Sequence, residues 1–347
     1  NDISKAVKLT GVSQDAIEEA ARIYANAENA VILYGNGITQ HRSGNDNVKS
    51  LVNLALLTGN IGKECSGIYP LMGQNNGQGA FNMGAIHDFY TDSQPVSDIN
   101  VRKKLEKVYK TKLSKNKGLQ IREMFNAASK GKVKAMYVMG ADPIMSEPDT
   151  TKVKKAIGKL DFLIVQDIFM SNTAQYADVV LPAACFAEKD GTFTNLERRV
   201  QRIRKTVEAP GEAKADWNII SELSTFMGSP MNYSSPEAIW EEVRKVSPNL
   251  AGINYQRLDN GGIQWPCPKA NHPGTKFLYE KKFPNEKATF SSIENKVTSE
   301  KTDKSYPFIL STGRTLYHFN SGTMTHRAKG SIQKQPYPFV EISQSDA

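Results

Sequence analysis

The chain has 347 residues, of which 39% are hydrophobic, and a formal net charge of +8. This length allows two or three domains with cores of their own. No run of about 18 apolar residues is present, which excludes a membrane-spanning helix from these residues. The positive charge is concentrated in the lysine-rich stretch 103–117, which we interpret as a solvated surface. No zinc-finger spacing or RNP-type aromatic motif accompanies it, so no nucleic-acid partner is expected.

The cysteines and the two ends of the chain bear on its setting. Cys65, Cys185 and Cys267 are far apart, and no C-x-x-C pair is present. They therefore predict neither a zinc site, nor an iron–sulfur cluster, nor a disulfide framework, and a reducing, cytoplasmic setting is expected. Because the chain begins at Asn1 rather than Met and stops just after a strand-like stretch at 337–342, we expect a piece of a longer protein.

The first 90 residues predict an α/β unit that ends in a glycine-rich loop. In chain order its elements are a helix at 13–29 with Ser13 as N-cap, a buried strand at 29–34, a helix at 46–57 and a glycine-rich tract at 58–84. Such a tract is typical of a loop whose backbone lies close to another group. Gly35-Asn-Gly37 follows the strand, but Gln40 stands where the dinucleotide fingerprint requires glycine, which argues against nicotinamide binding.

A second α/β unit follows a polar stretch. Its strands are expected at 134–139, 162–166 and 178–181, and its helical segments at 147–159, 172–176 and 213–227. Strand–helix alternation at this spacing predicts a doubly wound, mostly parallel sheet, so the fold class is α/β. The apolar residues 308–311 open a region that we expect to be β-rich.

The composition of the chain divides it into four regions. We expect part of a first α/β domain at 1–90, a second, Rossmann-like nucleotide-binding domain at 91–228, and an irregular, partly helical bridge at 229–305. Residues 306–347 would then begin a third, β-rich domain.

Small and polar residues follow two neighbouring strands of the predicted sheet. Gly140-Ala-Asp-Pro143 comes directly after one strand, and Gln166-Asp167 ends the next. The carboxyl ends of parallel strands meet at one edge, where a small-residue turn lets backbone N–H groups approach a phosphate. A carboxylate such as that of Asp167 can accept two hydrogen bonds from a guanine edge or bind ribose hydroxyls, although it could instead cap a helix. The pattern favours a nucleotide held across this edge.

The stretch 187–201, AEKDGTFTNLERRVQ, carries more polar groups than a surface hairpin needs. A hairpin-type Asp190-Gly191 dipeptide precedes Thr192, Thr194 and Asn195, and the charged triplet 197–199 follows. This combination is typical of a loop that holds a large polar ligand.

Four segments together resemble one protein family. They are GQNNGQGAFNMG (73–84), MGADPIMSEPD (139–149), VQDIFMSNTAQYADVVLPAACFAEKDGTFTNLERRVQ (165–201) and STGRTLYHFNSGTMT (311–325). The combination resembles the catalytic subunit of formate dehydrogenases, which belong to the molybdopterin oxidoreductase superfamily. The resemblance covers almost the whole chain, and it includes the stretch QWPCP (264–268).

The resemblance implies a cofactor, a substrate and partners. Two molybdopterin guanine dinucleotides (bis-MGD) would chelate Mo or W, formate would be oxidised to CO2, and a 4Fe-4S cluster and electron-transfer partners would carry the electrons away. The metal-ligating Cys or selenocysteine and the cluster cysteines lie upstream in the family, so this chain supplies no metal ligand. The residues implied to bind the cofactor are Gln74, Gly140, Asp142, Gln166, Asp167, Gly191, Thr192, Asn195, Thr312, Gly313, Arg314, His318 and Ser321. The last five would cap it from the start of a C-terminal β-barrel domain.

One position departs from the family pattern. The family's Gln-Asn motif is usually entered by Arg-Gly, with the Arg orienting formate, whereas this chain has Met72-Gly73. Methionine cannot form a bidentate, charge-assisted pair with a carboxylate. Another cation could take this role, or the substrate could be nitrate or another oxyanion. A cofactor-binding module without catalysis is a further alternative.

Overall fold

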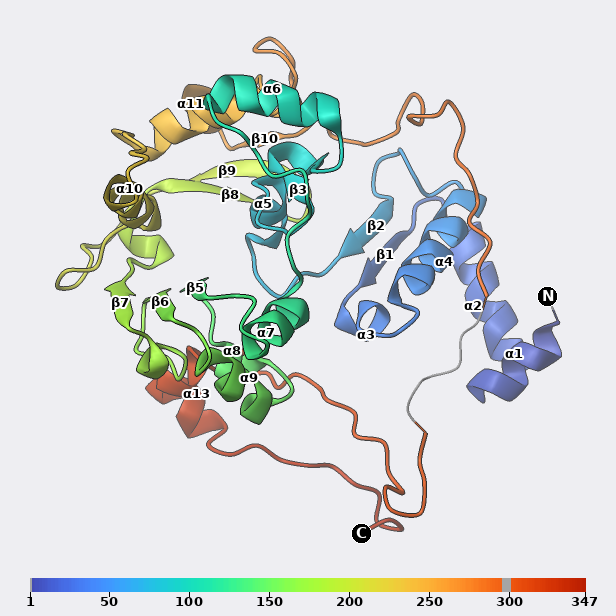
Figure 1. Cartoon of the computed structure of the whole chain (residues 1–347). Helices are drawn as coiled ribbons and strands as arrows, with labels where there is room; N and C mark the ends of the chain where they lie inside the picture. The colour runs from blue at the N-terminus through green and yellow to red at the C-terminus, as the bar shows by residue number, and fades with distance from the viewer. Residues whose placement is uncertain (1, 295–300) are drawn as a thin grey trace.

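The computed structural model describes residues 2–294 and 301–347 of the chain. Asn1 and residues 295–300, the latter in the expected bridge at 229–305, lie outside the described residues. Three groups of elements are visible in Figure 1: a two-stranded unit on the right, a parallel sheet at the lower left and an antiparallel sheet at the upper left.

The N-terminal unit has the helices and strand predicted from the sequence, but the strand is not buried as expected, since Val31 is 44% and Leu33 60% exposed. Its elements are α1 (Ile3–Thr10), α2 (Gln14–Asn26), β1 (Val31–Tyr34), α3 (Asn36–Thr39), α4 (Gly44–Leu57) and β2 (Gly67–Pro70). Ser13 caps α2, as expected, by accepting a hydrogen bond from the N–H of Ala16. Strands β1 and β2 pair in parallel, with Val31 opposite Gly67. The chain then passes through the loop at 71–76 into α5 (Gly77–Asn82).

The central sheet confirms the predicted parallel arrangement. Its strands β5 (Ala135–Met139), β6 (Phe162–Asp167) and β7 (Val179–Pro182) lie in that order, all parallel. The helices of this unit are α7 (Ile121–Ser129), α8 (Pro143–Ser146) and α9 (Thr150–Ile157). Leu163 and Val165 of β6 pack into a buried cluster with Phe125 of α7 and Val153 of α9. Apolar residues at every second strand position thus bury one sheet face under two helices.

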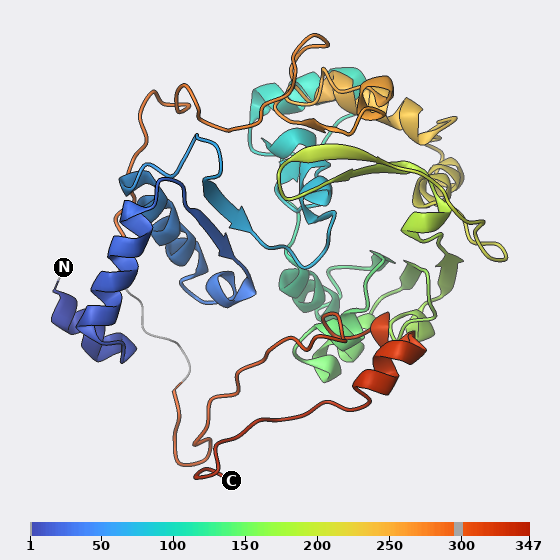
Figure 2. The ribbon, with the colours of Figure 1, turned by 180° about the vertical axis from the view of Figure 1, so that it is seen from behind.

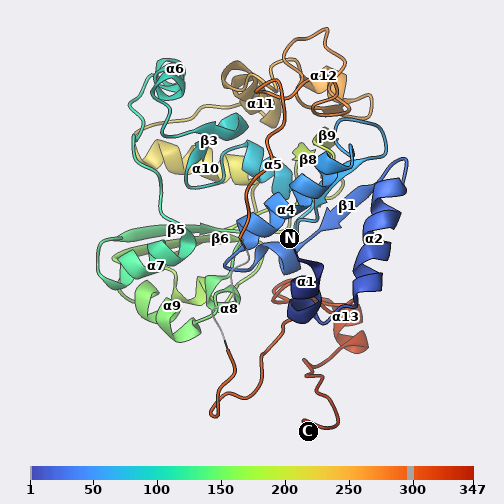
Figure 3. The same ribbon diagram turned by 90° about the vertical axis from the view of Figure 1, so that its right-hand side faces the viewer.

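The third group is antiparallel. It contains β8 (Gly191–Thr194), β9 (Arg199–Ile203) and β10 (Ile263–Gln264), with α10 (Asp216–Phe226), α11 (Pro236–Val246) and α12 (Tyr255–Leu258) around them. The same region contains α6 (Ile99–Tyr109) and the short antiparallel pair β3 (Phe89–Tyr90) and β4 (Gln94–Pro95). In the sequence these elements come before the central sheet. In Figure 3, α6, α10, α11 and α12 lie above the central sheet.

The hairpin differs from the sequence expectation in the position of its turn. Asp190-Gly191 does not form the turn, because Gly191 already begins β8. The chain reverses at 195–198 instead, where Arg198 adopts a left-handed backbone with φ of 64°. The Asn195 carboxamide oxygen accepts hydrogen bonds from the N–H groups of Glu197 and Arg199, both at 3.0 Å. Asparagine chemistry therefore builds this turn.

The C-terminal region does not form the expected strands. Residues 301–347 contain a 3-10 helix, η4 (Thr325–Arg327), and the helix α13 (Lys329–Lys334), and no strand. The expected start of a β-barrel is therefore not observed, because a strand needs a neighbour for its backbone hydrogen bonds and 308–311 finds none in these residues. Figure 2 shows this segment extending below the other elements, with α13 beside the central unit. There the Arg327 guanidinium donates to the Met170 carbonyl and lies over the Phe169 ring.

None of the helices formed by residues 2–294 and 301–347 has the length and apolar character needed to cross a membrane.

Candidate functional site

A cavity of about 520 Å³ lies at the carboxyl edge of the central sheet. We call it the strand-end cavity. Among the predicted cofactor-binding residues, those that line it are Gln74, Gly140, Asp142, Gln166, Asp167 and Ser321. These residues meet because the strands share one edge, as predicted: the parallel register sets Met139 opposite Gln166 and Gln166 opposite Leu181. The loops that follow β5 and β6 therefore leave the sheet side by side. The volume is in the usual range for small-molecule and cofactor sites.

The carboxylate of Asp142 is committed to holding two loops together. Asp142 is 7% exposed. Its oxygens accept hydrogen bonds from the backbone N–H groups of Asn172 and Thr173, which lie in the segment that follows β6, both at 3.0 Å. The Asn172 carboxamide and the Thr173 hydroxyl also donate to it, at 3.3 and 2.6 Å. With four bonds to the protein, this carboxylate shapes the wall of the cavity rather than offering acceptors to a ligand.

Gln166 stands in a chain of polar side chains behind the cavity. It is fully buried; its oxygen accepts from the Tyr137 hydroxyl, and its nitrogen donates to the Asp216 carboxylate at 2.5 Å. Asp216 also forms an ion pair with Lys189, which donates to the carbonyl of Ala184 at 2.9 Å. Because both the oxygen and the nitrogen of the Gln166 carboxamide are hydrogen-bonded, the orientation of this group is fixed. Its bond to Asp216 also joins β6 to the start of α10.

Asp167 is the acidic group of the cavity with spare hydrogen-bonding capacity. Its carboxylate accepts one bond from the N–H of Phe169 at 3.2 Å, while a carboxylate offers about four lone-pair sites. Burial raises the pKa of Asp167 above its usual value, and the nearby Asp142 adds to the rise, whereas Arg327 and backbone N–H groups oppose it. A carboxylate held partly out of water gains from a ligand that donates hydrogen bonds to it.

Gly140 leaves open space beside the sheet edge. Its N–H donates to the Gln166 carbonyl at 2.9 Å, and its φ of 60° is one that other residues rarely adopt. A Cβ placed there would meet no atom within 4 Å, so the backbone borders unfilled volume. The aromatic rings of Phe169, Phe186 and Phe319 also line the cavity. An acceptor carboxylate, an open backbone and apolar walls suit a ligand whose aromatic ring carries hydrogen-bond donors.

The hairpin residues predicted for this site lie elsewhere. Gly191, Thr192 and Asn195 belong to β8 and its turn and do not line the strand-end cavity. The hairpin still contacts the glycine-rich loop, because the N–H of Thr194 donates to the Asn76 carboxamide at 2.9 Å. The Asn195 side chain is thus used to build the hairpin, and the backbone of Thr194 joins the hairpin to the Gln74 loop.

Of the five C-terminal residues predicted to cap the cofactor, one lines the strand-end cavity and four do not. Ser321 lines the strand-end cavity, whereas Thr312, Gly313, Arg314 and His318 do not. The imidazole of His318 contacts the Gln335 carbonyl at 2.7 Å and the Thr325 hydroxyl at 3.2 Å, and it packs edge-on against the His326 ring. It therefore stabilises the C-terminal segment internally.

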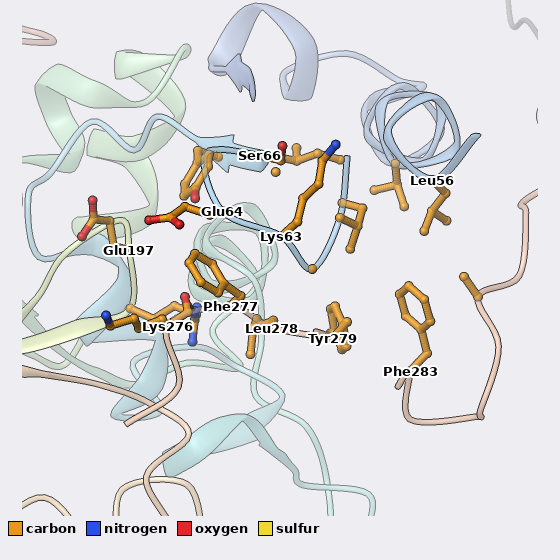
Figure 4. A pocket seen from close by; sticks show the side chains of 18 of the residues that line it. Leu56, Lys63, Glu64, Ser66, Glu197, Lys276, Phe277, Leu278, Tyr279 and Phe283 are labelled. Carbon is orange, nitrogen blue, oxygen red and sulfur yellow. Dashed lines mark hydrogen bonds between the residues drawn. The ribbon is translucent and has the colours of Figure 1, made fainter. Parts of the chain in front are cut away.

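A second cavity, of about 830 Å³, lies between the α4–β2 region and the segment 276–289. Figure 4 shows its apolar side chains, with Leu56 on one side and Phe277, Tyr279 and Phe283 on the other. The rings of Tyr279 and Phe283 stack at 5.2 Å. None of the residues predicted to bind the cofactor lines it, and it borders the start of β2 rather than the carboxyl edge of the central sheet. The predicted cofactor-binding residues that meet in a cavity therefore meet in the smaller one.

Three residues of the site were not predicted as site residues: Tyr137, Lys189 and Asp216. Asp216 was visible only as the acidic start of a helix, a common feature, and Lys189 as one charge in a polar stretch. Only the fold brings them to Gln166. No three His, Cys, Asp or Glu side chains in residues 2–294 and 301–347 are grouped so that they could hold a metal ion.

Comparison with known proteins gives the family of the chain. A molybdopterin oxidoreductase family model matches residues 6–226. The F420-dependent formate dehydrogenase subunit alpha of Methanocaldococcus jannaschii is 50% identical over 99% of this chain and 51% of that protein. Formate dehydrogenase H of Escherichia coli is 41% identical over 98% of this chain and 48% of that protein. The chain thus spans about half the length of the relatives that it matches.

A solved structure supports the fold. Acetylene hydratase from Pelobacter acetylenicus aligns with a TM-score of 0.53 at 20% sequence identity, covering 76% of this chain and 38% of that one. At this identity the likeness concerns the fold alone. Because the family model extends over more than half of the 347 residues, the chain belongs to the molybdopterin oxidoreductase family, whose cofactor is a molybdopterin.

Proposed function

We propose that the chain is part of an enzyme that oxidises formate to CO2 and that its strand-end cavity binds a guanine nucleotide of the cofactor. The observation that carries this proposal is the meeting of Gln74, Gly140 and Asp167 at one edge of a parallel sheet. The substrate is proposed because relatives that are 50% and 41% identical to the chain are formate dehydrogenases.

Each residue of the cavity has a defined part in this proposal. The Asp167 carboxylate accepts hydrogen bonds from the ring N–H and the exocyclic amine of guanine, which recognises that base. The open backbone at Gly140 allows a ribose or phosphate group to approach closely. Phe169, Phe186 and Phe319 provide apolar contact and keep water from the base. The Gln74 loop then runs from the nucleotide toward the pterin.

When bound, the metal and its pterin dithiolenes supply the redox chemistry, in which formate yields CO2, a proton and two electrons. We extend the proposal to a bis-MGD cofactor with Mo or W and to a 4Fe-4S cluster in the full-length protein. The M. jannaschii relative is named as an alpha subunit, so we also propose electron-transfer partner subunits. The three cysteines are unpaired, which agrees with the proposed reducing, cytoplasmic setting.

The test uses the full-length protein, purified without oxygen. We expect it to contain Mo or W, to release a guanine nucleotide and a pterin on denaturation, and to reduce a viologen dye when formate is added. Metal analysis and mass spectrometry of the released nucleotide are read out separately from activity. A protein without metal and guanine would contradict the cofactor proposal and favour a module without catalysis.

Met72 favours one alternative. Its position carries no charge, so a different oxyanion could be the substrate while the cofactor is unchanged. Supplying nitrate with reduced dye, in the same preparation, tests this alternative directly. Nitrate-dependent dye oxidation together with no formate-dependent reduction would replace formate in the proposal.

A further inference from the structure

A ridge of lysines lies along α6, at the top of Figure 1. Lys103 and Lys107 are four residues apart, so they share one side of the helix, and Lys110 follows as its C-terminal cap. Leu105 is fully buried on the opposite side and anchors α6 to the protein. All three lysines are exposed. We call these three residues the α6 ridge.

The α6 ridge is not neutralised by acids within the part of the chain that the structure describes. There, none of its three side chains has a hydrogen bond or an ion pair. Glu106 is close in sequence, but its carboxylate accepts from the N–H of Leu113 at 3.1 Å and lies 3.7 Å from Lys112. On α2, by contrast, Glu18 and Arg22 pair at 2.7 Å. Like charges four residues apart destabilise a helix, and nothing in these residues offsets that effect on α6.

The dipole of α6 explains only part of this pattern. Carbonyl groups at the end of a helix favour a cation in the last turn, where Lys107 lies. Lys103 is one turn earlier and gains little, because the effect falls off within the last turn. The positive charge also continues beyond the helix, since Lys112 and Lys115 lie in the exposed loop that follows it. A role in helix stability therefore does not account for the whole set.

The loop after α6 has a defined conformation. The bond from the N–H of Leu113 to Glu106 closes it onto the helix, and the Tyr90 hydroxyl donates to the Ser114 carbonyl at 3.0 Å. The backbone that carries the lysines is thus held in place while their charges remain in water. A surface of this kind loses less conformational entropy on binding than a flexible charged tail does.

We propose that the α6 ridge, with the lysines of the loop after it, docks a partner subunit that presents an acidic surface. Unpaired cations on a chain with a net charge of +8 are complementary to such a surface and speed the encounter with it. The inference rests on the partner subunits given under the proposed function, and it assigns a surface to one of them. Nucleic acid is the other polyanion that lysines attract, and it is tested below.

The segment around α9 provides a matched control set. Lys152, Lys155 and Lys159 are also three exposed lysines within eight residues, and none of them has an ion pair in the described ranges. In Figure 3, α9 lies below the central sheet, whereas α6 lies above it. A change made in both sets alters the net charge equally and differs only in its place on the molecule.

The first test maps contacts. The full-length protein, purified together with its partner subunits, is treated with a carbodiimide, which joins an amine to a carboxylate where the two touch. Mass spectrometry should find the α6 ridge joined to Asp or Glu of a second polypeptide, in several-fold higher yield than the α9 set. The absence of such cross-links would overturn the inference. Cross-links to acids of the same polypeptide alone would also overturn it, because the chain itself would then cover the ridge.

The second test measures affinity. The partner subunit is removed with salt and added back to full-length protein held on a sensor surface. Replacing all three ridge lysines with glutamine should raise Kd about 10-fold at low ionic strength, mainly through slower association. Arginine at the same positions should keep the affinity, and high salt should abolish the difference. The same three glutamine substitutions in the α9 set should change Kd less than about 2-fold.

Two results of this experiment would contradict the proposal. Equal losses in the α6 and α9 variants would show that only the net charge matters. If the α6 variant loses affinity for a double-stranded DNA fragment but keeps its affinity for the partner subunit, the ridge binds nucleic acid instead.

Formate turnover separates this inference from the proposed function. With a viologen dye as electron acceptor, the glutamine variant of the α6 ridge should reduce the dye as fast as the unaltered enzyme and contain the same metal. An enzyme that oxidises formate but gives no cross-link from the ridge overturns the inference and leaves the proposed reaction intact. Cross-links from the ridge to a partner subunit in a protein without formate turnover support the inference and contradict the proposed substrate.

Discussion

Replacing Asp142 with alanine is expected to lower the free energy of unfolding of the full-length protein by about 3–5 kcal/mol, the cost typical of removing one partner from a buried, charged hydrogen-bond network. The substitution leaves two backbone N–H groups, the buried Thr173 hydroxyl and the Asn172 carboxamide without their acceptor. The loops after β5 and β6 would then separate, and the strand-end cavity would lose its shape. Urea unfolding followed by tryptophan fluorescence measures the loss.

Asp149 provides the matched control for this experiment. It is an aspartate seven positions further along that caps α9 with a single bond to the N–H of Lys152, at 2.9 Å. Asp149→Ala should cost only about 1 kcal/mol, the usual value for an N-cap. Equal losses in the two variants would show that the network around Asp142 contributes nothing beyond an ordinary cap.

Replacing Asp167 with asparagine is expected to have opposite effects on binding and on stability. Asparagine keeps one acceptor oxygen but presents a donor where guanine also donates, so the affinity of the cofactor-free protein for GMP should fall about 10- to 100-fold, corresponding to about 1.5–3 kcal/mol. The free energy of unfolding should rise by no more than about 1 kcal/mol at pH 7, because the lost charge is partly buried but also screened by solvent.

The sign of the stability effect follows from the raised pKa of Asp167. When a carboxyl pKa is higher in the folded state, the folded protein holds the proton more tightly, so ionisation above that pKa destabilises the fold. The gain from Asp167→Asn should therefore be full above the folded pKa and disappear as the pH falls through it toward the unfolded value of about 3.9. Thermal melts between pH 3 and 8, with calorimetric GMP titrations, provide both measurements.

Asp178 is the control for GMP binding. It lies at the opposite end of the same sheet, where its carboxylate accepts from the N–H of Leu163 at 2.7 Å. Asp178→Asn should leave the GMP affinity unchanged. If it weakens GMP binding as much as Asp167→Asn does, the nucleotide is not recognised at the strand-end cavity.

Much of the fold could be predicted because the local patterns and the tertiary structure agree. Ser13 marks the start of α2, and the apolar runs at 134–139 and 162–166 form neighbouring parallel strands. The pairing of β8, β9 and β10 was not predictable, because Ile263 comes some 60 residues after its partner Val200. Strand-like composition at 308–311 was misleading for a related reason: residue type favours an extended backbone, but only a partner strand makes a sheet.

The site was predictable where backbone topology alone decides position. Gly140, Gln166 and Asp167 meet because parallel strands share an edge. Which side chains are already satisfied could not be read from the sequence. Asp142 and Gln166 look like ligand groups there, yet each is bonded to protein partners, Thr173 for the first and Asp216 for the second. Arg314 also lies close to Gly73, about 240 positions away in the sequence, and this approach left no local signal.

The order of the central sheet decides where the nucleotide preference of such a site can be changed. Strand β6 is hydrogen-bonded on both sides, so its carboxyl end cannot shift without breaking two ladders, whereas β5 and β7 are each bonded on one side within this sheet. The loop that follows β7 can therefore be lengthened or exchanged to admit larger or smaller ligands, whereas Asp142 ties the loop after β5 to the segment after β6. A change of the preferred base would call for a substitution at Asp167 itself, and a change of ligand size for changes in the loop after β7.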